Sequence, residues 1–181
     1  AMVYSTPSKW LMQKHPPLST PDGGPDPAAY HRFFDPFYRG AFDTGRQVRI
    51  VHARQLADLQ PDVAARHHPV LVVPALYVVD DATVDWLAAY AHAGGHLVLG
   101  PRTAYADQLA RARREPAPAR LVEAAGVRYD EFSNLAGDVP VRAVPGAPLC
   151  LPEGATATRW ADALTVVDAD VLVRYDHPHF G

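Results

Sequence analysis

Short, largely apolar runs alternate with an amphipathic segment through the middle of the chain. Val48–Val51 and Val70–Val73 are rich in β-branched residues, and such runs are typical of buried parallel strands. In Asp80–Ala93 the apolar residues recur at i, i+3, i+4 and i+7, with an aspartate as N-cap and Gly94-Gly95 as terminator. His96–Leu99 follows at once as a third apolar strand. This order of strands and helices predicts a parallel sheet.

The first 45 residues contain a proline-rich stretch followed by an aromatic one. Met2–Ser5 resembles the end of a strand, and Pro7–Pro27 holds six prolines, which predicts a long loop. Asp26 then caps a predicted helix that begins at Pro27, is kinked at Pro36 and stops at Gly45. Its apolar face comprises Tyr30, Phe33, Phe34, Phe37, Tyr38 and Ala41. That face is wider than one helix needs, so part of it is expected to meet another subunit or domain.

The second half is predicted to be rich in β-structure. Arg120–Ala125, ending at Gly126, reads as a short helix, and Glu115–Ala119 reads as a surface loop within the same domain. Four strands separated by Pro/Gly turns follow, at Val127–Phe132, Val139–Val144, Thr158–Val166 and Val171–Tyr175. We therefore expect one α/β domain over residues 1–181, with a mostly parallel sheet and extra strands in its second half.

Composition narrows the classes of function. A formal net charge of −3 and apolar runs of about ten residues argue against nucleic-acid and membrane partners. Cys150 is the only cysteine, so neither an intramolecular disulfide nor a CxxC redox pair exists. The opening Ala1-Met2 has no signal-peptide pattern and indicates a cloning remnant. We expect a cytoplasmic protein.

An active site in such a sheet is sought in the loops beyond the carboxyl ends of its strands. These loops hold His52-Ala53-Arg54, Pro74-Ala75-Leu76-Tyr77 and Gly100-Pro101-Arg102-Thr103, and none contains an obvious nucleophile. Cys150 lies between two leucines in a proline-flanked segment, where we expect a buried structural thiol rather than a nucleophile. Ser133 is the alternative nucleophile.

Cofactor and metal sites find little support in the pattern. The chain has no GxGxxG or GxxxxGK[ST] string, which argues against nucleotide binding. Gly94-Gly95 separates His92 from His96, so the two imidazoles do not share a helix face and are expected to be exposed. His67-His68 and His177-Pro178-His179 lack a third ligand and read as surface residues. We expect no cofactor and no metal.

Glycoside hydrolysis needs two carboxyl groups on opposite sides of the scissile bond. The acidic pairs Asp80-Asp81 and Asp130-Glu131 have simpler roles, as helix cap and as exposed strand residues. Trp10 is placed in the predicted loop, where stacking on a sugar is an alternative role. For Trp86 and Trp160 we expect packing in a core or an interface.

The string PALYVVDDATVDWLAAYAHAGGHLVLGPRT, Pro74–Thr103, resembles the middle segment of family 42 β-galactosidases. Ala125-Gly126-Val127, Glu131-Phe132, Trp160-Ala161-Asp162 and Val171–Asp176 resemble later parts of the same domain, so the resemblance covers most of residues 30–181. Tyr4–Pro27 departs from the family pattern, which has a tryptophan-rich stretch there.

The resemblance implies a flavodoxin-like or class I glutamine amidotransferase-like three-layer sandwich that serves as a trimerisation domain. It also implies a separate (β/α)8 barrel in the same polypeptide, which carries both catalytic glutamates, and a homotrimer that meets galactosides only through that barrel. No catalytic, cofactor-binding or metal residue is then expected in this chain. Two alternatives stay open: a freestanding amidotransferase-like or esterase-like hydrolase using Cys150 or Ser133, and a carbohydrate-binding module using Trp10.

Overall fold

A parallel sheet of four strands forms the centre of the first half of the molecule. The computed structural model describes residues 1–178. The sheet contains β1 (Met2–Tyr4), β2 (Ile50–His52), β3 (Val70–Val73) and β4 (His96–Leu99), in the order β2-β1-β3-β4. The chain therefore passes from β1 to one side of the sheet and then crosses to the other, which creates a topological switch point between β1 and β3.

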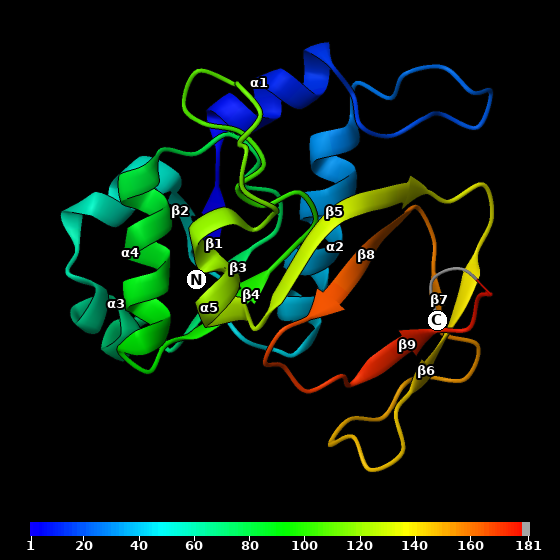
Figure 1. Cartoon of the computed structure of the whole chain (residues 1–181). Helices are drawn as coiled ribbons and strands as arrows, with labels where there is room; N and C mark the ends of the chain where they lie inside the picture. The colour runs from blue at the N-terminus through cyan, green and yellow to red at the C-terminus, as the bar shows by residue number, and fades with distance from the viewer. Residues whose placement is uncertain (179–181) are drawn as a thin grey trace.

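Helices cover both faces of this sheet (Figure 1). α1 (Thr6–Lys14) and α2 (Ala29–Asp43) connect β1 to β2, while the 3-10 helix η1 (Ala53–Asp58) and α3 (Pro61–His67) lead to β3. α4 (Asp81–His92) connects β3 to β4. Alternate strand residues point to opposite faces. Accordingly Val3 and Leu71 pack in one apolar cluster with residues of α3 and α4, and Met2 and Val72 in another with residues of α1 and α2. The result is a three-layer sandwich.

The second half adds antiparallel strands beside the sandwich. The short helices η2 (Ala119–Leu121) and α5 (Val122–Ala125) end at Gly126, whose φ is +66°. The strands are β5 (Val127–Asn134), β6 (Val139–Ala143), β7 (Thr156–Ala157), β8 (Trp160–Val166) and β9 (Val173–Tyr175). β5 pairs with β8, and β6 lies between β7 and β9. Trp160 joins the α1 and α2 cluster through an edge-on contact with Phe33, with 5.6 Å between the ring centroids.

The predicted loop over Pro7–Pro27 is wrong in its first third, which forms α1. The Ser5 hydroxyl caps this helix by accepting the Ser8 amide at 3.2 Å, and Pro7 occupies the first turn, where its missing N–H costs nothing. The other five prolines of the segment all follow the helix. Trp10 is consequently a helical residue, 64% exposed, and not a loop residue.

The remaining elements agree with expectation apart from details. The helix predicted from Pro27 begins at Ala29, and the Asp26 carboxylate accepts the Ala28 amide at 2.9 Å. The helix continues through Pro36. Ala117 and Ala119 are buried, so Glu115–Ala119 is a surface loop only in its first part. β2 and β3 are buried at their centres, whereas the first residue of each is exposed.

Candidate functional site

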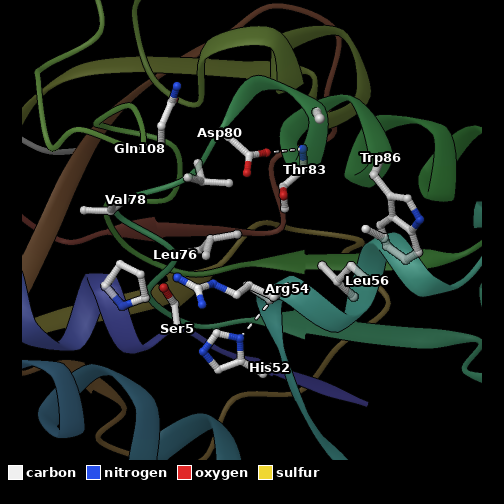
Figure 2. A pocket seen from close by; sticks show the side chains of 15 residues that line it. Ser5, His52, Arg54, Leu56, Leu76, Val78, Asp80, Thr83, Trp86 and Gln108 are labelled. Atoms are coloured by element: carbon white, nitrogen blue, oxygen red, sulfur yellow. Dashed lines mark hydrogen bonds between the residues drawn. The ribbon is translucent and has the colours of Figure 1, made fainter.

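The carboxyl ends of β1, β2 and β3 enclose a pocket of about 330 Å³ at the switch point, hereafter the switch-point pocket. Figure 2 shows His52, from the end of β2, and Arg54, from η1, on one side and Asp80 and Thr83, from the N-cap and first turn of α4, on the other. Two of the three predicted strand-end loops line it, those at His52–Arg54 and Pro74–Tyr77. Its position is the one where this class of sheet binds ligands.

The serine hydroxyls at this pocket are engaged in hydrogen bonds that hold α1 to the sheet. The Ser8 hydroxyl is fully buried, accepts the Val78 amide at 3.0 Å and lies 2.9 Å from the Ser5 hydroxyl. The Ser5 amide donates to the Tyr30 hydroxyl at 2.8 Å, and burial raises the pKa of Tyr30 above its ordinary value of 10.0. These bonds serve packing, because each hydroxyl is already committed to a neighbouring protein group.

A threonine and a histidine at the pocket rim lie at the distance of a catalytic dyad, but the histidine lacks the acceptor at Nδ1 that such a dyad needs. The Thr6 hydroxyl lies 3.0 Å from His52 Nε2, and His52 Nδ1 accepts the Arg54 amide at 3.2 Å. The Thr6 amide also donates to His52 Nε2 at 3.4 Å, so backbone N–H groups approach both ring nitrogens and the hydrogen bonds do not place the single proton of a neutral imidazole. A general base of the Ser-His-Asp type needs Nδ1–H held by an acceptor, whereas Nδ1 of His52 itself accepts an amide. His52 acts instead as the N-cap of η1.

The acidic pairs have the roles predicted for them. The Asp80 carboxylate accepts the Thr83 amide at 2.7 Å and caps α4, while Asp81 pairs with Arg113 at 2.5 Å. Asp130 and Glu131 are exposed on β5, where the register shifts in a bulge. These carboxyl groups are therefore occupied in capping, in an ion pair or in contact with solvent.

The expectation of a buried thiol at Cys150 is wrong, because the residue is exposed. It lies in the loop between β6 and β7, where proline and glycine turns keep the backbone at the surface, and its two leucine neighbours are only half-buried. His92 and His96 are exposed on either side of the turn after α4, as predicted. Within residues 1–178, no group of three His, Cys, Asp or Glu residues has the geometry to hold a metal ion. His179 lies outside the described residues.

Exposed apolar side chains gather on β8 and on the connection to β9. Leu164, Val166, Val167 and Leu172, hereafter the β8 patch, are 40–55% exposed. Three of them line a pocket of about 330 Å³ between β8 and β9. The aromatic face of α2 divides as expected: its first part is buried, whereas Tyr38 and Phe42 stack on each other at the surface. Among the described helices, none is long and apolar enough to cross a membrane.

Sequence reasoning missed one residue of interest, Arg102 in the third strand-end loop. Its guanidinium lies over four aromatic rings and lines a second pocket, of about 510 Å³. The rings come from segments up to 83 residues apart, from Tyr77 to Trp160, so no local pattern marks them. Trp86 and Trp160 pack against the cores as predicted.

These features define an α/β sandwich in which Ser5, His52 and Asp80, at the switch-point pocket, take part in structural hydrogen bonds. The chain belongs to the beta-galactosidase trimerisation domain family, whose model matches residues 1–180. The sandwich, parallel sheet and extra antiparallel strands agree with the fold that the family resemblance implied.

Relatives named as beta-galactosidases match most of the chain. One from Halorubrum lacusprofundi is 27% identical over 135 residues, and one from Haloferax lucentense is 28% identical over 142 residues. These alignments cover 75% and 78% of the chain, but only 17% and 19% of the relatives. The beta-galactosidase structure from Rahnella sp. R3 has a TM-score of 0.81 at 19% identity, covering 99% of this chain and 25% of that one. The Halorubrum lacusprofundi structure has a TM-score of 0.68 at 25% identity, covering 99% and 24%.

Proposed function

We propose that this chain is the self-association domain of a longer β-galactosidase polypeptide, in which it holds three copies together. The observation that carries the proposal is the family match over residues 1–180, together with relatives of which the chain spans less than a fifth. Hydrolysis of terminal β-galactosides would then take place in the remainder of the polypeptide, and galactosides would meet this domain only indirectly.

The arrangement of polar groups supports a non-catalytic role for the whole chain, which we treat as a single domain. Glycoside hydrolysis needs two carboxyl groups that flank one bond, whereas the acidic pairs here cap a helix, pair with arginine or face solvent. The alternative of a small independent hydrolase is disfavoured, because Cys150 is exposed on a loop and His52 Nδ1 accepts the Arg54 amide instead of being held by an acceptor.

The β8 patch is the surface that we assign to contact between copies. Stable interfaces bury about 800 Å² per partner around an apolar centre. The β8 patch concentrates four exposed apolar side chains within nine consecutive residues, 164–172, and borders a hollow into which a partner's side chains can pack. A charge placed at Val166 would be buried without a partner in such an interface, at a cost of several kcal/mol.

The test is the molar mass of the native polypeptide that carries this domain, measured by light scattering. We expect three copies for the unsubstituted protein and a shift to single copies for Val166→Asp. Leu109→Asp is the matched control, because Leu109 is 65% exposed and lies outside both the β8 patch and the aromatic face of α2. A single-copy mass without any substitution would overturn self-association, whereas three copies in Val166→Asp would remove the β8 patch from the interface.

We also propose a cytoplasmic location, since an exposed and unpaired Cys150 suits a reducing compartment. Cell fractionation tests this point, with the protein expected in the fraction that holds cytoplasmic markers. Recovery in the culture medium would contradict it.

A further inference from the structure

Arg102 occupies a cage of aromatic rings at the junction of the two halves of the molecule. Its guanidinium carbon lies 4.7 Å from the centroids of both Tyr77 and Tyr105, 4.8 Å from Phe132 and 5.3 Å from Trp160. The rings form two stacked pairs, one from the loops after β3 and β4 and one from β5 and β8. Rings of this kind attract a cation through their faces and keep the guanidinium plane in a fixed orientation.

The cage leaves the hydrogen-bonding capacity of the guanidinium largely unused. Nη2 donates to the Tyr77 hydroxyl at 3.2 Å, but the buried Nε has no acceptor among residues 1–178. No ion pair joins Arg102 to a carboxylate of the described chain either. Asp162 is the nearby acidic group, and one of its oxygens already accepts the Trp160 indole N–H at 2.9 Å. An arginine offers five N–H donors, and aromatic faces satisfy none of those in its plane.

The backbone at Arg102 is held in an unfavourable conformation as well. Its φ is +58°, in the left-handed region that residues with a Cβ seldom adopt. Such conformations persist where surrounding contacts impose them, and they gather at ligand sites. In this conformation the Arg102 side chain lies over the four rings.

Arg102 contributes to the wall of a pocket of about 510 Å³, hereafter the Arg102 pocket. The other lining residues come from two places. Tyr77 and Ala110 belong to loops of the sandwich, and the end of α1 with the turn that follows it contributes Leu11, Met12, His15, Pro16 and Pro17. The walls are therefore mainly apolar, with one permanent cation and one imidazole. A volume of this size suits a small ligand or a single inserted side chain.

We infer that the Arg102 pocket binds a small ligand or side chain that ends in a carboxylate. The carboxylate forms an ion pair with Arg102 through two parallel hydrogen bonds, and the short aliphatic part of the ligand packs on Leu11 and Met12. A carboxylate has two oxygens in one plane, which match the fork of the guanidinium. A phosphate dianion fits less well, because one arginine among apolar walls leaves most of its charge unpaired. The carboxylate belongs either to a free short-chain acid or to an Asp or Glu side chain of a neighbouring polypeptide.

The first experiment titrates the unsubstituted chain with propionate at constant ionic strength and follows the Arg102 Nε–H signal by ¹H–¹⁵N NMR. Propionamide serves as the matched neutral ligand. We expect a saturable shift with propionate and none with propionamide, because only the carboxylate completes the ion pair. Absence of a saturable shift, or an equal response to propionamide, would overturn the inference without any substitution being needed.

The second experiment uses two variants. Arg102→Lys keeps the charge but loses the planar fork, so propionate binding, followed at the Met12 methyl signal, is expected to weaken at least about tenfold. Arg54→Lys, at an exposed residue outside the Arg102 pocket, is the control and is expected to bind normally. Equal binding by both variants would contradict the assignment to Arg102.

The third experiment separates the two sources of the carboxylate. It measures the molar mass of the native polypeptide in excess propionate. A loss of assembled copies identifies a neighbouring side chain as the natural occupant, and an unchanged mass identifies a free acid. Both results presuppose the propionate binding of the first experiment, so the inference stands apart from the proposed self-association.

Discussion

Replacing Ser8 by alanine removes the bond that ties α1 to the loop after β3. The Ser8 side chain is fully buried, and its hydroxyl accepts the amide of Val78, a residue only 7% exposed. Ser8→Ala therefore leaves a buried N–H without an acceptor, which costs about 1–3 kcal/mol. Alanine favours the helix by a few tenths of a kcal/mol over serine. The net loss of unfolding free energy is about 1–2 kcal/mol.

Urea denaturation of the purified chain measures this loss directly. The transition midpoint should fall while the slope of free energy against urea stays the same, because the exposed surface hardly changes. For a chain of this size, the melting temperature should fall by about 2–4 °C for each kcal/mol. Ser133→Ala is the matched control: Ser133 is half-buried on β5, and its replacement should change stability by no more than about 0.5 kcal/mol. Equal stability of the two variants would refute the reasoning.

Three further predictions concern backbone packing, pH and thiol exposure. Gly100→Ala should cost about 1–3 kcal/mol in urea denaturation, since a Cβ there would overlap the Pro74 carbonyl, whereas Gly137→Ala, with nothing within 4 Å, should be close to neutral. Burial raises the pKa of Asp162 above 3.8, so the folded state holds this proton more tightly than the unfolded state, and the resulting stability is lost as pH rises through the raised pKa. Asp162→Asn should therefore gain stability relative to the unsubstituted chain from acid to neutral pH. A stability difference that stays constant with pH would argue against this reasoning. Cys150 should react with a thiol reagent in the folded chain, one equivalent without denaturant, and protection from the reagent would contradict its exposure.

The elements best predicted from sequence are those in which local signals agree with one another. α4 has an aspartate cap, a helical repeat of apolar residues and a glycine terminator, and it forms within one residue of the expected bounds. The apolar strands on either side, β3 and β4, were equally clear. In contrast, α1 was not predicted, because the number of prolines was counted over the whole of Pro7–Pro27. Five of the six prolines follow the helix, and the Ser5 cap at its start was not considered.

The candidate sites depended on contacts that no local pattern contains. The strand-end loops at the switch-point pocket followed from the expected sheet, and the capping role of Asp80 followed from its place before a helix. The Arg102 cage arises because β5 and β8 bring Phe132 and Trp160 against loops of the parallel sheet. Cys150 was expected to be buried from its leucine neighbours, but its exposure depends on where the loop between β6 and β7 runs.

The most direct test of the central claim is the mass and activity of the native polypeptide that carries this domain, purified from its source cells. The account predicts three copies of a chain several times longer than 181 residues, together with hydrolysis of a chromogenic β-galactoside. A single-copy protein of 19.7 kDa without galactosidase activity would contradict it.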